Sequence, residues 1–220
     1  MSSADHLLTG PLALFGGTFD PVHYGHLRCA DEVRQKLQLE KLYLLPAGCP
    51  PHRETPVASV KQRLEMLQLA LAEFPFLQVD DRETRRSGPS YMVDTLQELR
   101  TKFPQRPLIL VIGQDAANHL HGWHHWQELF GFTHLVILTR PGSRAEYRQD
   151  LAKNMLRRSV SDMQELLCLK AGRVLDMEVT SIDISATTIK SIIRLGRLPH
   201  SMLPDSVLDY INENRLYLSS

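Results

Sequence analysis

The stretch LALFGGTFDPVHYGH, residues 12–26, passes from a short apolar run through two glycines to a pair of histidines. The apolar run ends at Gly16 and Gly17, as a buried strand does where it meets a turn. Beyond it, between Gly25 and Leu37, apolar side chains recur at helical spacing. A strand, a glycine turn and a helix in this order open a βαβ unit, so the stretch predicts parallel strands.

The same alternation continues along the chain. We predict further strands over residues 41–46, 77–79, 108–112, 134–139 and 174–179, and further helices over 59–71, 92–103, 185–195 and 204–214. Short, continuously apolar strands between helices are typical of a mostly parallel sheet covered on both faces. The sequence therefore predicts a doubly wound α/β fold whose last two helices form a small C-terminal region. Residues 141–172 give no clear pattern, because polar runs interrupt their helical spacing.

The composition limits the class of protein. With 220 residues, 43% hydrophobic and 23% charged, the chain has the make-up of one ordinary globular domain, and a disordered or fibrous protein is excluded. Lys plus Arg and Asp plus Glu number 25 each, so no overall charge attracts nucleic acid or an anionic membrane. Three widely spaced cysteines fit neither a disulfide framework nor a zinc knuckle. Since no signal peptide or membrane-spanning apolar run is recognised, we expect a cytoplasmic protein.

His23 and His26 lie three residues apart at the start of the first predicted helix, so both imidazoles can face one point. The glycines before them expose backbone amides near a helix N-terminus, where a phosphate is favoured. A zinc pair and two unrelated surface histidines stay open as alternatives. The spacing does not match HExxH, and no cysteine or carboxylate is placed to complete a zinc site, so we expect no metal ligands in the chain. Neither a Walker sequence nor GxGxxG is present.

Two motifs carry a resemblance to a known family. GGTFDPVHYGH, residues 16–26, resembles the HxGH signature of a nucleotidyltransferase superfamily, and ISATTIK, residues 184–190, resembles its second signature, the ISATxxR type. Further matching segments are PPHR at 50–53, PSY at 89–91 with DTL at 94–96, GQD at 113–115, WHHW at 123–126 and RPG at 140–142. Over nearly its whole length the chain resembles the bacterial nicotinate mononucleotide adenylyltransferases.

This resemblance implies a fold, a reaction and a division of the chain. Enzymes of the family join ATP and nicotinate mononucleotide to give nicotinate adenine dinucleotide and pyrophosphate, a step towards NAD. The implied fold is Rossmann-like, in agreement with the pattern of strands and helices. Residues 1–184 would form the nucleotide-binding and catalytic domain, and residues 185–220 a C-terminal helical region that completes the ATP site. The oligomeric state does not follow from the sequence.

The resemblance also implies the residues that hold ATP. His23 and His26 would be the catalytic residues and would donate hydrogen bonds to the phosphates rather than act as nucleophiles. The other implied ATP contacts are Gly16, Gly17, Thr18, Phe19, Gly113, Asp115, Ile184, Ser185, Thr187 and Lys190. Without the family, Ser185 and Asp115 are also typical of helix N-caps.

A second set of residues is implied for the mononucleotide. Trp123 would stack on the pyridine ring, although a tryptophan is more often a core aromatic. Backbone amides at Met92 and His124 would receive the nicotinate carboxylate. Arg53 and Arg140 would meet phosphate, with a solvated loop charge as the alternative. The complete implied set is Asp20, Arg53, Ser90, Tyr91, Met92, Thr95, Trp123, His124 and Arg140.

One position departs from the family pattern. The second signature normally ends in arginine, but here it ends in Lys190, which keeps the positive charge and loses the rigid bidentate fork. The phosphate contact is then weakened or moves to Arg194. Mg²⁺ is expected to arrive with ATP and to bridge phosphate oxygens largely through water, in keeping with a sequence that shows no dense carboxylate cluster.

Two other functions compete with adenylyl transfer to nicotinate mononucleotide. The first is transfer within the same superfamily to phosphopantetheine or nicotinamide mononucleotide, and the WHHW segment and the chain length count against phosphopantetheine. The second is a non-catalytic nucleotide sensor on the same fold. The intact His23, His26 and Ser185 argue against a sensor. Pyrophosphate release separates enzyme from sensor, because a sensor binds ATP without releasing pyrophosphate.

Overall fold

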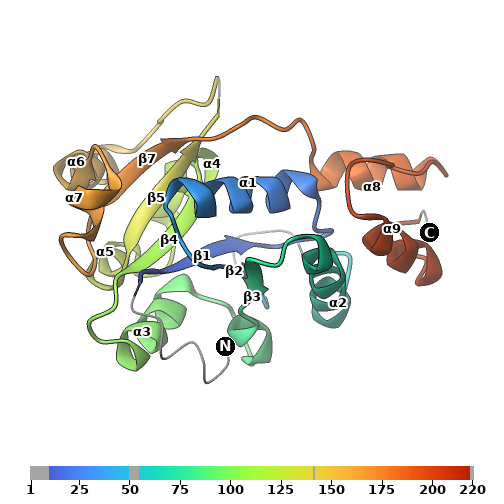
Figure 1. The fold of residues 1–220 in the computed structure, drawn as a ribbon, viewed down its shortest axis with the longest axis horizontal. Helices are drawn as coiled ribbons and strands as arrows, with labels where there is room; N and C mark the ends of the chain where they lie inside the picture. Colours follow the sequence, from blue (N-terminus) through green and yellow to red (C-terminus); the bar gives the residue numbers. More distant parts are fainter. Residues whose placement is uncertain (1–9, 50–54, 141, 219–220) are drawn as a thin grey trace.

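The computed structural model describes residues 10–49, 55–140 and 142–218, and within them one seven-stranded sheet forms the centre of the molecule (Figure 1). The strands are β1 (Leu12–Gly17), β2 (Leu42–Pro46), β3 (Leu77–Val79), β4 (Leu108–Gly113), β5 (His134–Thr139), β6 (Ser159–Val160) and β7 (Val174–Glu178). Their order is β3-β2-β1-β4-β5-β7-β6, and every neighbouring pair is parallel. The predicted doubly wound, Rossmann-like fold is confirmed, and the strand order reverses between β1 and β4.

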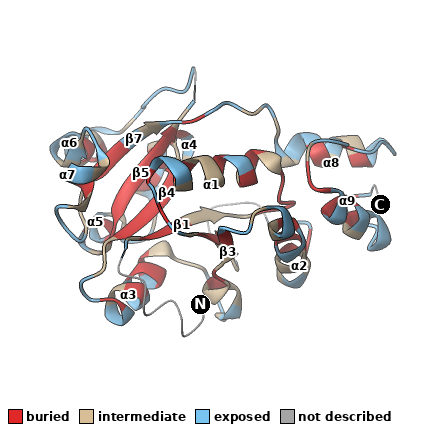
Figure 2. Cartoon of the chain, viewed as in Figure 1, coloured by how far each residue is buried: buried red, intermediate tan, exposed pale blue. Residues whose placement is uncertain are grey.

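Helices cover both faces of the sheet, because successive strand residues point to opposite sides. In β1, Ala13 belongs to one apolar cluster, whereas Leu12 and Leu14 belong to the other. The first cluster includes residues of α1 (Tyr24–Lys36), α2 (Val60–Ala70), α7 (Met163–Leu167), α8 (Ala186–Arg194) and α9 (Asp205–Glu213). The second includes residues of α3 (Met92–Lys102), α4 (Gln114–Asn118), α5 (Leu129–Phe132) and α6 (Gln149–Arg158). Figure 2 shows the central strands buried and the outer helix faces exposed.

The structure adds elements that the sequence pattern did not predict. Between residues 142 and 172 lie α6, β6 and α7, and β6 extends the sheet by pairing with β7. β6 has only two residues and α7 only five, which is too short to show a period. Four 3₁₀ turns also complete the described connections: η2 (Leu71–Glu73), η3 (Arg82–Arg85), η4 (Leu120–Gly122) and η5 (Trp126–Glu128).

The C-terminal helices α8 and α9 lie beside the first turn of α1 (Figure 1). Ile189 of α8 and Ile211 of α9 belong to the same apolar cluster as Val22, which precedes α1. The backbone N–H of Tyr24 also donates a hydrogen bond of 2.9 Å to the carbonyl of Met202. The predicted boundary at residue 184 stays a prediction, and the segments on its two sides share one core.

Candidate active site

The carboxyl ends of β1 and β4 flank the point where the strand order reverses, which is where open α/β sheets bind ligands. Gly17 ends β1 and Gly113 ends β4. The first turns of α1 and α8 lie next to each other at this edge (Figure 1), and a Cβ built on Gly25 would lie 3.2 Å from the carbonyl oxygen of Ile184. The fold therefore brings the two signature motifs together.

His23 and His26 lie face to face at the start of α1. Their ring centroids are 3.7 Å apart with the planes at 27°. The ring of Phe19 packs edge-on against His26, with the centroids 5.1 Å apart. Gly25 stands between the two histidines in sequence, and a Cβ at this position would lie 2.9 Å from the His23 ring. Any larger residue at Gly25 would thus displace an imidazole.

Burial keeps His23 neutral. Its side chain is 5% exposed, and burial together with the charge of Arg140 lowers the pKa of His23 to about 4. Within the described residues nothing forms a hydrogen bond with its buried Nδ1. A neutral imidazole of this kind can donate one directed hydrogen bond to an anion.

The first turn of α8 lies at the same edge of the sheet as the first turn of α1 (Figure 1). The hydroxyl of Ser185 accepts a hydrogen bond of 3.1 Å from the backbone N–H of Thr188, so its interpretation as an N-cap is confirmed. Thr187 is exposed in the first turn, and this turn contains no acidic residue. The N-terminal end of the helix dipole therefore faces no competing side-chain charge of its own turn, a setting that favours a phosphate.

Asp20 is buried, at 6% exposure, in the turn between β1 and α1. Among the described residues, its carboxylate accepts four hydrogen bonds, from the backbone N–H groups of Val57 and Ala58 (3.0 Å each), from Lys190 Nζ (3.2 Å) and from the Tyr217 hydroxyl (2.8 Å). Burial raises the pKa of Asp20, but these partners outweigh burial and lower it overall. The implied contact of Asp20 with the mononucleotide stays a prediction, and the structure shows a carboxylate already surrounded by donors.

Arg63 is a site-shaping residue that the sequence analysis missed. It is 1% exposed and donates hydrogen bonds to the carbonyls of Thr18 and Ala47 (2.8 Å each) and Gly48 (3.1 Å). It thereby joins the loops that follow β1 and β2. A signal was present in the sequence, because Arg63 lies in the buried stripe of α2 with Met66, Leu67 and Ala70.

On the other face of the sheet, a second group of predicted residues lies together at the start of α3. The hydroxyl of Ser90 accepts hydrogen bonds from the backbone N–H groups of Gly48 and Cys49, both at 3.1 Å. The rings of Tyr91 and His124 are 4.3 Å apart at an angle of 32°. A Cβ on Gly16 would meet Met92 Cε at 3.5 Å, which places Met92 against the end of β1. Half-buried Trp123 packs at the rim of the second apolar cluster.

Other predicted residues are paired within the protein, exposed, or outside the described residues. Thr95 is fully buried, donates to Glu83 at 2.8 Å and accepts from Arg86 at 2.9 Å, so its hydroxyl is already paired within the protein. Asp115 is exposed in the first turn of α4, and because Gly113 is the N-cap there, the N-cap alternative for Asp115 is wrong. Arg140 is exposed after β5, close enough for its charge to act on His23. Arg53 lies outside the described residues.

Comparison with known proteins decides the family. The cytidylyltransferase-like family model matches residues 14–192. A Methylococcus capsulatus protein named "Probable nicotinate-nucleotide adenylyltransferase" is 45% identical over 207 residues, which cover 94% of this chain and 99% of that protein. An Aeromonas hydrophila protein of the same name is 42% identical over 211 residues, or 96% of this chain and 99% of that protein. The chain belongs to the nicotinate-nucleotide adenylyltransferase family.

The fold agrees with this family. The solved structure of a Plasmodium falciparum nicotinic acid mononucleotide adenylyltransferase in complex with NaAD matches with a TM-score of 0.72 at 14% identity, covering 94% of this chain and 97% of that one. The family resemblance and the enzyme class predicted from the sequence are confirmed, and the chain is a nucleotidyltransferase.

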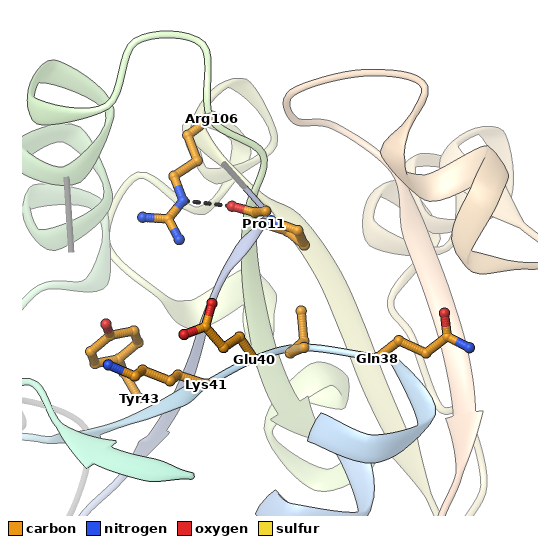
Figure 3. A pocket seen from close by; sticks show the side chains of 8 residues that line it. Pro11, Gln38, Glu40, Lys41, Tyr43 and Arg106 are labelled. Carbon is orange, nitrogen blue, oxygen red and sulfur yellow. Dashed lines mark hydrogen bonds between the residues drawn. The ribbon is translucent and has the colours of Figure 1, made fainter. Parts of the chain in front are cut away.

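The described residues also form a cavity away from the two signature motifs. This small cavity lies at the opposite, amino-terminal edge of β1, β2 and β4, between Glu40, Lys41 and Arg106 (Figure 3). None of the predicted site residues lines it. The described residues contain no group of three or more His, Cys, Asp or Glu side chains that could hold a metal ion. Nor do these residues form a helix long and apolar enough to cross a membrane.

The space at Gly25 gives a testable expectation. Gly25→Ala would place a Cβ 2.9 Å from the His23 ring and 3.2 Å from the Ile184 carbonyl, so the ring or the start of α8 must move. We expect a loss of about 1–3 kcal/mol in the free energy of unfolding, the usual scale of overpacking. Urea unfolding of the purified protein measures this loss.

The matched control is Gly131→Ala, because a Cβ at this position in α5 meets nothing within 4 Å. We expect its stability to stay within about 1 kcal/mol of the parent or to rise, since alanine favours helix more than glycine does. Equal stability of the two variants would contradict the proposed crowding between α1 and α8.

Proposed function

We propose that this enzyme transfers the adenylyl group of ATP to nicotinate mononucleotide, giving nicotinate adenine dinucleotide and pyrophosphate in NAD biosynthesis. Membership of the family supports the proposal. The observation that carries it is the pair of stacked imidazoles at the start of α1, one of them neutral and buried, next to the start of α8. Such a setting suits the negative charge of a phosphate chain.

In the proposed reaction an oxygen of the mononucleotide's 5′-phosphate attacks the α-phosphorus of ATP. The new P–O bond forms as the bond to the pyrophosphate breaks, and the electron pair of that bond leaves with the pyrophosphate. The attacking phosphate is already ionised near neutral pH, so no residue has to remove a proton. Positioning and charge stabilisation are what the protein supplies. His23 and His26 donate hydrogen bonds to the phosphoryl oxygens as charge grows on them.

The remaining roles divide into an ATP group and a mononucleotide group. On the ATP side we assign Gly16, Gly17, Thr18, Phe19, Gly113, Asp115, Ile184, Ser185, Thr187 and Lys190. The exposed carboxylate of Asp115, at the carboxyl end of β4, suits the ribose hydroxyls. On the mononucleotide side, Trp123 offers its ring to the pyridine, and the amides near Met92 and His124 suit the nicotinate carboxylate.

Magnesium enters this proposal as part of the substrate, bound to the phosphates of ATP. The described residues contain no group of three or more His, Cys, Asp or Glu side chains that could hold a metal ion, and we assign no residue of the chain as a ligand of Mg²⁺. Mg²⁺ keeps several waters and often binds through substrate phosphates. When bound, it neutralises charge on the phosphate chain.

The histidine pair generates the first expectation for activity. His23→Ala and His26→Ala should each lower kcat by about 10²- to 10³-fold, the scale for removing one preorganised donor to a developing charge. Pyrophosphate release measures kcat, and circular dichroism checks the fold. Exposed His200 offers the control His200→Ala, which should keep parental turnover. Near-parental activity in both histidine variants would remove the phosphate-stabilising role.

Substrate choice generates the second expectation for activity. Nicotinate mononucleotide should be preferred over the nicotinamide form, because a carboxamide turns NH₂ donors towards donor amides and leaves one of them unpaired. Each lost contact costs about 1–3 kcal/mol, or about 5- to 150-fold in kcat/KM. The measurement is kcat/KM for both mononucleotides. Equal values would contradict the nicotinate assignment.

Trp123 provides the matched comparison for that preference. Trp123→Ala should weaken both substrates, since both carry a pyridinium ring, and should leave most of the discrimination in place. Trp126, whose ring packs on Phe130 with centroids 6.3 Å apart, gives the control Trp126→Ala, which should lower stability more than it changes KM. A preference that collapses only in Trp123→Ala would move the source of specificity from the amides to the ring.

Metal dependence generates the third expectation for activity. Activity should require free Mg²⁺ supplied with ATP, and the purified protein should hold no stoichiometric zinc despite its histidine pair. Elemental analysis and an assay across Mg²⁺ concentrations test both parts. One zinc per chain, lost together with activity on chelation, would contradict this expectation.

A further inference from the structure

Tyr217 lies outside both signature motifs and beyond the residues that the family model matches, yet its side chain reaches the turn before α1. The residue is 3% exposed, and its hydroxyl donates a hydrogen bond of 2.8 Å to Oδ1 of Asp20. Burial and the neighbouring carboxylate raise the pKa of Tyr217 well above its usual range. The hydroxyl therefore keeps its proton and stays a donor at neutral pH.

The backbone is strained where it places this ring. Tyr217 has a φ of 63° and Arg215 a φ of 53°, both in the left-handed region. A bulky residue rarely adopts this conformation, and the surrounding contacts must compensate for its cost in free energy. The hydrogen bond to Asp20 and the burial of the ring are such contacts.

The C-terminal segment contacts the turn between β1 and α1, here called the catalytic turn, on both sides of His23. On one side Tyr217 binds Asp20, three residues before His23. On the other side the carbonyl of Met202 accepts a hydrogen bond of 2.9 Å from the backbone N–H of Tyr24. The position of the His23 ring therefore depends on contacts made by residues far along the chain.

The same carboxylate also holds Lys190. Nζ of Lys190 lies 3.2 Å from Oδ2 of Asp20 and 6.0 Å from the centroid of the Tyr217 ring. Buried Arg63 adds a further positive charge that acts on Asp20. If the hydroxyl were removed, the Ala58 amide would be the one donor left to Oδ1 among the described residues, and the carboxylate would attract Lys190 more strongly.

We propose that Tyr217 is a positioning residue for adenylyl transfer, which acts through Asp20 on the turn that carries His23 and on the ammonium group of Lys190. The proposal rests on the proposed function, because that function assigns His23 and Lys190 to the phosphates of ATP. The hydroxyl spreads the charge of Asp20 over several donors, and this leaves Lys190 able to turn towards a phosphate. Through His23 and Lys190, Tyr217 thus acts on the ATP half of the site.

The test is Tyr217→Phe, which keeps the buried ring and removes only the hydroxyl. We expect kcat to fall about 10-fold and the KM for ATP to rise about 3- to 10-fold, the scale of one lost hydrogen bond to a charged group. The KM for the mononucleotide should change less than the KM for ATP, because Ser90 and Trp123 keep their contacts. With Lys190→Met already present, Tyr217→Phe should raise the KM for ATP no further, since coupled residues are non-additive.

Tyr210→Phe is the matched control. Tyr210 is also in the C-terminal region, and its hydroxyl donates to a carboxylate, that of Glu65 on α2. This variant removes the same kind of bond without touching the catalytic turn. Urea unfolding should show a loss of stability in both variants, whereas only Tyr217→Phe should change kcat and the KM for ATP. Equal kinetic losses in the two variants, or unchanged constants in Tyr217→Phe, would overturn the proposal.

Failure of the proposed function is distinguishable from failure of this inference. A wild-type protein that releases no pyrophosphate with nicotinate mononucleotide would contradict the function. Calorimetric binding of a non-hydrolysable ATP analogue tests the inference separately, because it needs no acceptor. Weaker binding in Tyr217→Phe with parental binding in Tyr210→Phe supports the role of Tyr217, and equal binding in all three proteins overturns it.

Discussion

The buried carboxylate of Asp20 is the point at which the parts of the site are joined. A buried charge costs free energy unless its ionised form is fully hydrogen-bonded, and here the donors outweigh burial and lower the pKa of Asp20. Those donors come from the backbone before α2, from α8 and from the C-terminal segment, which is 197 residues away in sequence. Satisfying one charge therefore fixes the relative positions of distant segments around the turn that carries His23.

Arg63 complements Asp20 in the neighbouring loops. Loops that follow parallel strands leave backbone groups outside the sheet ladder, and buried backbone groups need partners. Asp20 accepts from amides, and Arg63 donates to the carbonyls of Thr18, Ala47 and Gly48. Two buried side chains thus provide partners for backbone groups in the described parts of these loops.

The parts of this fold that repeat a local period could be predicted from the sequence. The strands at β1, β4 and β5 are continuous apolar runs, and the spacing in α1 and α2 shows which face they bury. β6 could not be predicted, because two residues carry no period. The proximity of the two signatures came from the family resemblance. The pairing of Asp20 with Tyr217 left no local signal, because a hydrogen bond between residues so far apart depends on the whole fold.

The electrostatics of the histidine pair follow from keeping His23 neutral. Two imidazolium charges at the observed ring spacing of 3.7 Å would repel, by about 4 kcal/mol for unit charges about 4 Å apart at an effective dielectric constant of 20. Burial and Arg140 lower the pKa of His23 to about 4, which removes one of these charges at neutral pH. Because the chain as a whole has a formal net charge of zero, attraction for an anion must then come from local groups. In the proposed reaction, Arg140, Lys190 and the helix N-termini would supply that attraction, and the neutral ring of His23 would supply direction. When charged groups attract an anion and a neutral ring orients it, two histidines can stack without repelling each other.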